Sequence, residues 1–390
     1  MVEEADALAR ILSAASPLPM VERPLREALG SFLAQPMRST MAHPRFDNSV
    51  VDGYAIRVAD EPGERILCGE QPAGQDRSLR LEKNEASRIF TGAPIPAGCT
   101  GVAMQEDVTV ENGRVHLRES VEPGENIRRA GADLAAGQLI GSPGQRITPQ
   151  LVALLASQGL ATAPAHRMPR VTVLSTGDEL RPLGVPLLSG EIYDSNSPML
   201  AALLQSLGIQ AELRHSPDDL TATQLEIRRA LETSDVLIIS GGVSVGDHDH
   251  VKPALAALGV ALDLWRIRMK PGKPLAFARS GEKLIFGLPG NPLASFVTFL
   301  VLLRPALLQM LGARDGERFL PVKTLQLDSP LANTGDRPHY VRGRIEGERF
   351  VPQGLQESHA LFGLSRSDAL LRMGAGTEIA GGEMVSVLVW

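Results

Sequence analysis

Between residues 170 and 311, short runs of aliphatic and β-branched residues alternate with longer amphipathic segments. This pattern predicts strands at residues 171–174, 236–239 and 284–288, and helices at 199–207, 223–232, 250–258 and 291–311. A helix that connects two strands of the same sheet forms a right-handed crossover, which leaves the two strands parallel. Strands that alternate with helices therefore predict a mainly parallel sheet. The region is therefore predicted to form an open, doubly wound α/β domain.

The flanking segments differ from this region. Helices are predicted at residues 2–15, 24–34 and 151–160, whereas short β-like runs and an Asn112-Gly113 hairpin signal occupy the stretch between them. After Gly312 the pattern is again typical of strands, at 322–327, 340–345 and 384–389. We predict a helical domain (1–37 and 139–165), a β-rich insertion (38–138), the α/β domain (166–312) and a small C-terminal β domain (313–390).

Composition excludes several classes of protein. The 390 residues carry a net charge of -6, so the molecule has no overall basic field for nucleic acid. Cys68 and Cys99 show no zinc or disulfide spacing, which favours a reducing compartment. The acidic N-terminus is unlike a signal peptide, and the apolar stretch 296–311 is interrupted by Arg304 and Pro305. We expect a cytoplasmic protein that binds neither nucleic acid nor membrane.

Unusual loops follow the three predicted strands. They are Ser175–Glu179, Ser240–Gly246 and Pro289–Pro292. Ligands of open parallel sheets bind beyond the carboxyl ends of the strands, so these loops should form one binding rim. The glycine-rich loop can hold an anion against backbone N–H groups, but it lacks the Lys-Ser/Thr ending of a nucleotide triphosphatase. A simple tight turn is an equally good interpretation of that loop.

Charged residues near the rim have two interpretations each. Asp249 could cap the next helix and also hold Mg²⁺, which takes one or two carboxylates plus substrate oxygens. On a strand, Arg266, Arg268 and Lys270 would point to one side and bind an oxyanion; alternatively they protect a solvated edge strand. The segments 45–54 and 91–96 could be turn chemistry only.

An ordered set of segments nevertheless resembles the molybdopterin molybdenumtransferases, the bacterial MoeA type shared with the gephyrin E domain. The segments are FDNSVVDGYA (46–55), TGAPIPAG (91–98), ENIRRAGAD (125–133), STGDEL (175–180), YDSN (193–196), GGVSVGDHD (241–249), KPGKP (270–274) and GLPGNP (287–292). The resemblance implies the same four domains, with the helical domain as a stalk and the C-terminal domain as β-barrel-like. It also implies an elongated homodimer and an α/β domain similar to that of enzymes that adenylate molybdopterin.

The resemblance, together with the rim loops, implies two sets of site residues. The catalytic set is Asp52, Thr91, Asp133, Glu179, Asp249 and Lys270, with Glu179 and Asp249 as Mg²⁺ ligands. The substrate-binding set is Arg128, Asp218, Gly241, Gly242, Ser244, Gly246, Arg266, Lys273, Pro289, Asn291, Pro292 and Ser358. Arg266 stands where some members have lysine, and the two side chains are not interchangeable where geometry is tight.

The implied reaction inserts molybdate into adenylated molybdopterin with Mg²⁺ and releases AMP. The implied partners are these two substrates, a second copy of the chain, and the enzyme that adenylates molybdopterin. One alternative is a pterin adenylyltransferase, since the α/β domains are similar. A second is a gephyrin-like scaffold, although the chain lacks the long linker and fused domain expected there.

Overall fold

A computed structural model describes residues 1–60, 62–243 and 249–390. Within them the chain forms two compact units. Unit 1 comprises Met1–Gln35, Ser142–Leu155 and Leu160–Trp390, and unit 2 comprises Pro36–Gly141 and Ala156–Gly159. Each unit is described on its own.

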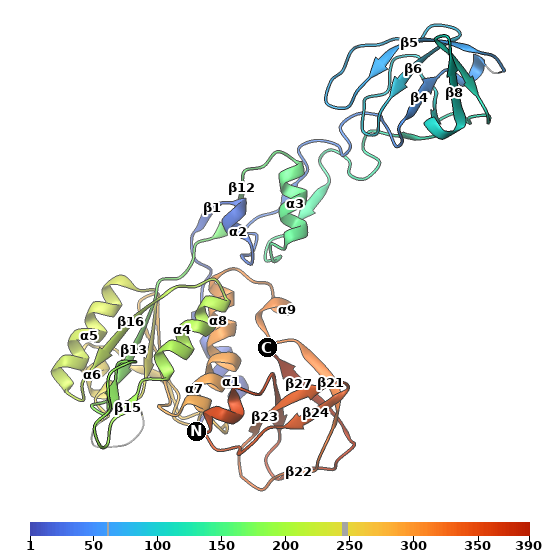
Figure 1. Ribbon diagram of the computed structural model, residues 1–390. Coiled ribbons are helices and arrows are strands. Elements are labelled where there is room, and N and C mark those ends of the chain that lie inside the picture. Colours follow the sequence, from blue (N-terminus) through green and yellow to red (C-terminus); the bar gives the residue numbers. More distant parts are fainter. Residues whose placement is uncertain (61, 244–248) are drawn as a thin grey trace. The chain divides into compact units, whose positions relative to one another are not determined.

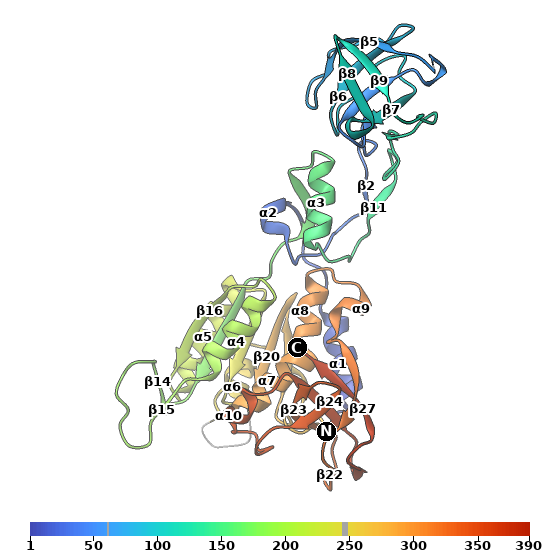
Figure 2. The ribbon, with the colours of Figure 1, turned by 45° about the vertical axis from the view of Figure 1, so that its right-hand side comes forward.

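The centre of unit 1 is a mixed sheet with the order β16-β13-β17-β20-β19-β18 in the described part of the chain (Figures 1 and 2). Its strands are β13 (Val171–Thr176), β16 (Ala211–Ser216), β17 (Val236–Ser240), β18 (Leu262–Trp265), β19 (Ala276–Ser280) and β20 (Lys283–Leu288). Strands β16, β13, β17 and β20 run parallel, while β19 and β18 continue antiparallel at one edge. The prediction of a mainly parallel sheet is confirmed.

Helices cover both faces of this sheet because successive strand residues point to opposite sides. On one face Val173 packs in a cluster with α1 (Glu4–Ala14), α4 (Asn196–Ser206) and the helix at 292–310. On the other face its neighbour Leu174 packs with α5 (Leu220–Thr233) and α6 (Val251–Ala257). The domain is thus doubly wound, as predicted.

The predicted helix at 291–311 is confirmed within one residue at each end. It runs from α7 (Pro292–Thr298) through a π-helical turn (Phe299–Leu303) into α8 (Arg304–Met310). Arg304 and Pro305 interrupt the apolar stretch without ending the helix, because Pro305 falls in the first turn after the π segment. By length and composition this helix could cross a membrane, but 83% of its apolar window is buried inside the fold. It is packed as a core helix.

The C-terminal part of unit 1 contains a closed barrel with the order β21-β24-β23-β25-β27. Its strands are β21 (Val322–Leu327), β23 (His339–Glu346), β24 (Arg349–Pro352), β25 (Ala369–Met373) and β27 (Met384–Val389), and β22 (Leu331–Asn333) pairs with β26 (Thr377–Ile379). Short helices α9 (Asp315–Arg318) and α10 (Leu361–Leu364) accompany them. Tyr340 and Leu370 join the α/β core cluster, so the barrel packs directly onto the α/β domain.

The remainder of unit 1 is only partly helical. It has α2 (Leu25–Ala28), α3 (Pro149–Ser157) and an antiparallel pair of β1 (Met20–Pro24) with β12 (Thr162–His166). The predicted helix at 24–34 is wrong beyond Ala28. There Phe32 and Leu33 are fully buried and make β-bridges to Arg146 and Ala165, so they enter the core from extended chain.

Unit 2 is built on a sheet with the order β7-β4-β6-β5-β9-β8 among its described residues. The strands are β4 (Gly53–Ile56), β5 (Arg65–Gln71), β6 (Glu85–Ile89), β7 (Gly101–Met104), β8 (Val108–Glu111) and β9 (Arg114–Leu117). Two shorter pairs are β2 (Met37–Arg38) with β11 (Leu139–Gly141) and β3 (Asn48–Ser49) with β10 (Ile127–Arg128). Asn112 and Gly113 both have positive φ between β8 and β9, which confirms the predicted hairpin.

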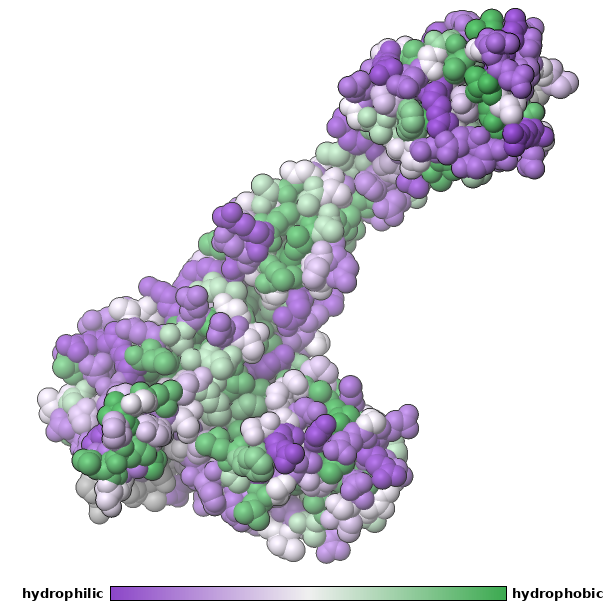
Figure 3. Space-filling model, viewed as in Figure 1, coloured by the Kyte–Doolittle hydropathy of each residue, from purple (hydrophilic) through white to green (hydrophobic). Residues whose placement is uncertain are grey.

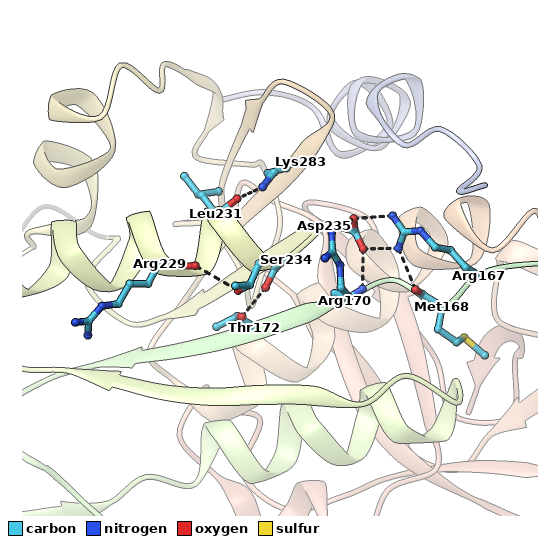
Figure 4. Close-up of polar contacts among 10 residues, drawn as sticks. Arg167, Met168, Arg170, Thr172, Arg229, Leu231, Ser234, Asp235 and Lys283 are labelled. Carbon is cyan, nitrogen blue, oxygen red and sulfur yellow. Dashed lines mark hydrogen bonds and ion pairs between the residues drawn. The ribbon is translucent and has the colours of Figure 1, made fainter. Parts of the chain in front are cut away.

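An ion-pair cluster lies at the amino ends of two central strands (Figure 4). Asp235, just before β17, accepts hydrogen bonds from the Arg167 guanidinium at 2.7 and 2.8 Å and from the Arg170 N–H at 2.8 Å. Burial alone would raise the pKa of Asp235, but these bonds outweigh it and hold the pKa well below its usual range. The cluster fixes one end of the sheet and leaves the carboxyl ends for binding.

Candidate functional site

A cavity of about 750 Å³ opens at the carboxyl ends of the four parallel strands. The loops after β13, β16, β17 and β20 all contribute to its wall, together with His359 and Leu361 of the C-terminal domain. Of the predicted site residues, those that line it are Glu179, Asp218, Gly241, Gly242, Asp249, Pro289, Asn291 and Pro292. Residues far apart in the sequence therefore meet at the rim, as expected for a parallel sheet.

The β13 loop places Glu179 by means of Gly177. Gly177 has φ +144°, and a Cβ there would lie 2.4 Å from Glu179 Oε2. No other residue type fits this position without displacing the carboxylate. The absence of a side chain at Gly177 therefore leaves room for the Glu179 carboxylate beside the backbone at the end of β13.

The β16 loop carries Asp218, which is braced by Asp178 of the β13 loop. The Asp218 N–H donates to Asp178 Oδ1 at 3.1 Å, and the Asp178 N–H donates to Asp218 Oδ2 at 3.3 Å. Asp219, the next residue, caps α5 by accepting from the Ala222 N–H. Only Asp218 of these three lines the cavity.

The β17 loop approaches β13 too closely for side chains. Gly241 and Gly242 have φ of +92° and +63°, and a Cβ on either would come within 3.0 Å of Thr176. Ser244 and Gly246, both predicted to bind substrate, lie outside the described residues. Where the description resumes, Asp249 lines the cavity and His250 takes the N-cap position of α6.

The β20 loop is fixed on both sides. Asn196 of α4 is buried and donates to Ser240 Oγ at 2.9 Å and to the Gly290 carbonyl at 2.7 Å, so it ties the β17 and β20 loops together. Asn291 Nδ2 donates to Ser358 Oγ at 2.9 Å, and the Leu293 N–H donates to the Ser358 carbonyl at 3.1 Å. Ser358, predicted from the resemblance, thus anchors the C-terminal domain to the start of α7.

The predicted basic stripe does not exist as a strand. Strand β18 ends at Trp265, and Arg266 has a left-handed φ of +64°. The Arg266 guanidinium lies 4.1 Å from the centre of the Trp265 ring, whose N–H donates to the Val243 carbonyl. Arg268 instead pairs with Glu3. The wall of the cavity includes Pro274 but not Arg266, Lys270 or Lys273.

The described wall of the cavity is acidic. Glu179, Asp194, Asp218 and Asp249 contribute carboxylates, whereas no lysine or arginine is among the described lining residues. Asp194 also accepts from the N–H and hydroxyl of Ser197 in the first turn of α4. No group of three or more His, Cys, Asp or Glu close enough to hold a metal ion occurs in residues 1–60, 62–243 and 249–390.

An apolar arm, residues 180–193, borders the cavity and contains the short pair β14 (Leu180–Arg181) and β15 (Ile192–Tyr193). Figure 3 shows apolar side chains gathered over β15. The exposed apolar residues of the arm are Leu183, Val185, Leu187, Leu188, Ile192 and Tyr193. A cluster of this kind is typical of a contact surface.

The predicted residues of unit 2 form a separate group. Asp52 precedes β4 and Thr91 follows β6, and these strands pair, so Asp52 Oδ1 accepts from the Thr91 N–H at 2.8 Å and from the Thr91 hydroxyl at 2.9 Å. These bonds, the backbone one first, hold the pKa of Asp52 below its usual value. Asp133 and Arg128 are exposed. Arg129, beside Arg128, pairs with Asp47 at 2.7 Å.

Contributors to the cavity that were missed from the sequence include Asp194, Asn196 and His359. Asp194 and Asn196 lie in the YDSN segment, which was noted only for its resemblance. His359 has no local pattern that marks it. Its place at the cavity follows from the anchored Ser358 beside it.

Comparisons with known proteins cover nearly the whole chain. Family models match for the MoeA N-terminal region (domain I and II) at residues 2–159, a probable molybdopterin binding domain at 172–309, and the MoeA C-terminal region (domain IV) at 324–390. A molybdopterin molybdenumtransferase from Nostoc sp. is 36% identical over 90% of this chain and 82% of the relative. The molybdopterin molybdenumtransferase from Haemophilus influenzae is 35% identical over 93% of this chain and 92% of the relative. A structure of a molybdopterin biosynthesis moeA protein from Pyrococcus horikoshii matches with a TM-score of 0.86 and 29% identity. The match covers 100% of this chain and 99% of that one.

Proposed function

The chain belongs to the molybdopterin molybdenumtransferase family, and we propose that its substrate is adenylated molybdopterin, from which it releases AMP on molybdate insertion. As a member of that family it is a transferase of molybdenum cofactor biosynthesis that inserts molybdate. The observation that carries the proposal is the acidic cavity at the carboxyl ends of the four parallel strands. A cavity of that size accommodates a nucleotide-sized ligand.

Magnesium fits this cavity by the chemistry of its wall. Mg²⁺ prefers carboxylate oxygens and completes its shell with substrate phosphate oxygens and water. We propose Glu179 and Asp249 as its protein ligands, since both line the cavity and two carboxylates suffice. Bound there, the ion would withdraw charge from a phosphate. Residues of the protein hold the phosphoanhydride of the adenylated substrate in place. Gly241 and Gly242 let this group approach the backbone closely, and Asn196 fixes the two loops that enclose it.

The acidic wall also supports a homodimer with a shared site. Two anionic substrates need cationic groups, yet the described wall supplies no lysine or arginine. Unit 2 carries Arg128 on β10, and the partner strand β3 ends three residues before Asp52. We propose that a second copy of the chain supplies this group, with the apolar arm as a contact surface. We further propose a cytoplasmic location and contact with the enzyme that adenylates molybdopterin, since that enzyme makes the substrate.

The test is a reconstitution with defined components. Purified protein receives adenylated molybdopterin, molybdate and Mg²⁺, and released AMP and pterin-bound molybdenum are measured. We expect both in equal amounts, and neither when molybdate is omitted. A second arm supplies ATP and molybdopterin without the adenylated substrate. Adenylated product in that arm, with no AMP release in the first, would overturn the proposal in favour of an adenylyltransferase.

A further inference from the structure

His359 is the one side chain in the described wall of the cavity that can carry a positive charge. The acidic groups there are the carboxylates of Glu179, Asp194, Asp218 and Asp249 and the phenol of Tyr193. An imidazole also retains an N–H donor when it is neutral, which none of the ionised carboxylates has. Among the described lining residues, His359 is therefore the one that combines an N–H donor with the capacity for a positive charge.

The fold holds this residue at the cavity. Its neighbour Ser358 makes two hydrogen bonds to the start of α7, one through its hydroxyl to Asn291 and one through its carbonyl to the Leu293 N–H. On the other side, α10 begins at Leu361, which also lines the cavity. The segment is thus fixed on both sides of His359. Its imidazole is exposed and has no hydrogen-bond partner among the residues that the structure describes.

An unpartnered donor in an acidic cavity matches what the substrates require. Resting on the proposed function, the cavity receives two tetrahedral oxyanions, molybdate and the phosphate of the adenylated pterin. The carboxylates of the wall repel both oxyanions. A hydrogen-bond donor supplied by the C-terminal domain lowers that repulsion. We propose that His359 is a substrate-binding residue, supplied by the C-terminal domain, whose imidazole N–H donates to an oxygen of one of these oxyanions.

Variants at His359 separate a donor from a packing role. His359→Ala removes the donor, His359→Gln keeps a neutral N–H, and His359→Lys keeps a cation. Loss of a hydrogen bond to a charged ligand weakens binding roughly 10-fold or more. We expect His359→Ala to show that loss, His359→Gln a smaller one, and His359→Lys affinity within about threefold of wild type.

Controls come from the same segment. Glu357→Gln removes one charge two residues away, and Leu355→Ala shortens an exposed side chain of that segment. Neither residue lines the cavity, so both variants should bind as wild type does. Thermal unfolding of every variant checks that the fold is retained.

Two probes identify the oxyanion, and neither depends on turnover. Binding of AMP with Mg²⁺ and binding of inorganic molybdate are measured separately by calorimetry, alongside half-saturating concentrations in the AMP-release assay. A change confined to AMP assigns His359 to the phosphate, and a change confined to molybdate assigns it to the metal oxyanion.

Unchanged binding of both probes by folded His359→Ala overturns the inference, as does equal loss in the Ala and Lys variants. Absence of AMP release by the wild-type chain overturns the proposed function instead, while the binding arms still decide the role of His359.

Discussion

Asp178 and Asp218 each accept a hydrogen bond from the other's backbone N–H, at 3.1 and 3.3 Å. The pair links the loops that follow β13 and β16, although only Asp218 reaches the cavity. Asp178 is therefore a positioning residue. Its side chain holds the Asp218 backbone and its backbone N–H holds the Asp218 carboxylate, while Asp178 itself does not line the cavity.

The first prediction tests this bracing. Asp178→Ala should lower kcat/KM of AMP release several-fold while costing about 1 kcal/mol or less of stability, because an exposed hydrogen bond is worth little to folding. Asp178→Asn keeps the acceptor oxygen and should retain near wild-type activity. Steady-state kinetics and urea unfolding measure both. An Asn variant as impaired as the Ala variant would show that charge, rather than bracing, is what matters.

The second prediction concerns Mg²⁺. Asp249→Asn keeps the size of the side chain and removes its charge, so we expect a near-normal Tm with strongly reduced AMP release. The Mg²⁺ concentration for half-maximal activity should rise as well. Asp219→Asn is the matched control, since Asp219 caps α5 at the same edge of the sheet but does not line the cavity. If Asp249→Asn loses stability but keeps its activity per folded molecule, Asp249 serves structure alone.

The third prediction concerns Asp235. Its side chain is 13% exposed and holds two arginines, so Asp235→Asn should cost about 2–3 kcal/mol. The pKa of Asp235 is depressed in the folded state, so its contribution is present above the unfolded pKa and is lost as pH falls through the acid range. Asp263→Asn, which breaks an exposed pair with Arg279, should cost under about 1 kcal/mol. Equal losses in the two variants would contradict this account.

The fourth prediction uses His339, which is buried at the start of β23. Burial, followed by Lys270, Arg337 and Arg342, lowers the pKa of His339 to about 4 from 6.5. Between these values the unfolded chain binds the extra proton, so stability is complete above pH 6.5 and falls as pH drops toward 4. This group should account for up to about 3 kcal/mol of that loss.

Urea unfolding across this pH range tests the account of His339. His339→Gln should flatten the pH dependence, whereas His215→Gln, at an exposed position on β16, should keep the wild-type slope. A wild-type slope in His339→Gln would assign the acid sensitivity to other groups.

The rim could be predicted because it rests on local patterns. Apolar runs end at Thr176, Ser240 and Leu288, and glycine or proline follows each at once, so the parallel sheet and its binding edge follow from chain order. The hairpin at Asn112-Gly113 was predictable for the same reason. In each case one short segment carries its own physical signal.

What could not be predicted depends on contacts between distant segments. Arg266, Arg268 and Lys270 alternate as strand residues do, but the Trp265 ring and the C-terminal domain bind them in irregular chain. Phe32 and Leu33 lie in a stretch predicted as helix and yet are buried through bridges to residues more than 100 positions away. His359 reaches the cavity because Ser358 bonds to Asn291, and no sequence pattern records that pairing.

The last prediction is that each active site combines the α/β domain of one subunit with unit 2 of the other. Asp52 and Thr91 form a hydrogen-bonded pair whose donor and acceptor groups contribute to no core, and the described wall of the acidic cavity supplies no lysine or arginine for anionic substrates. The test is a mixed dimer of Asp52→Ala and Asp249→Ala chains, each expected to be inactive as its own homodimer. A shared arrangement gives one site with both lesions and one with neither, so the heterodimer should recover up to about half of wild-type activity. If each site lay within one chain, both sites would carry a single lesion and activity would not return. Size-exclusion chromatography of the tagged heterodimer confirms assembly, so a folded heterodimer without activity rules the shared site out.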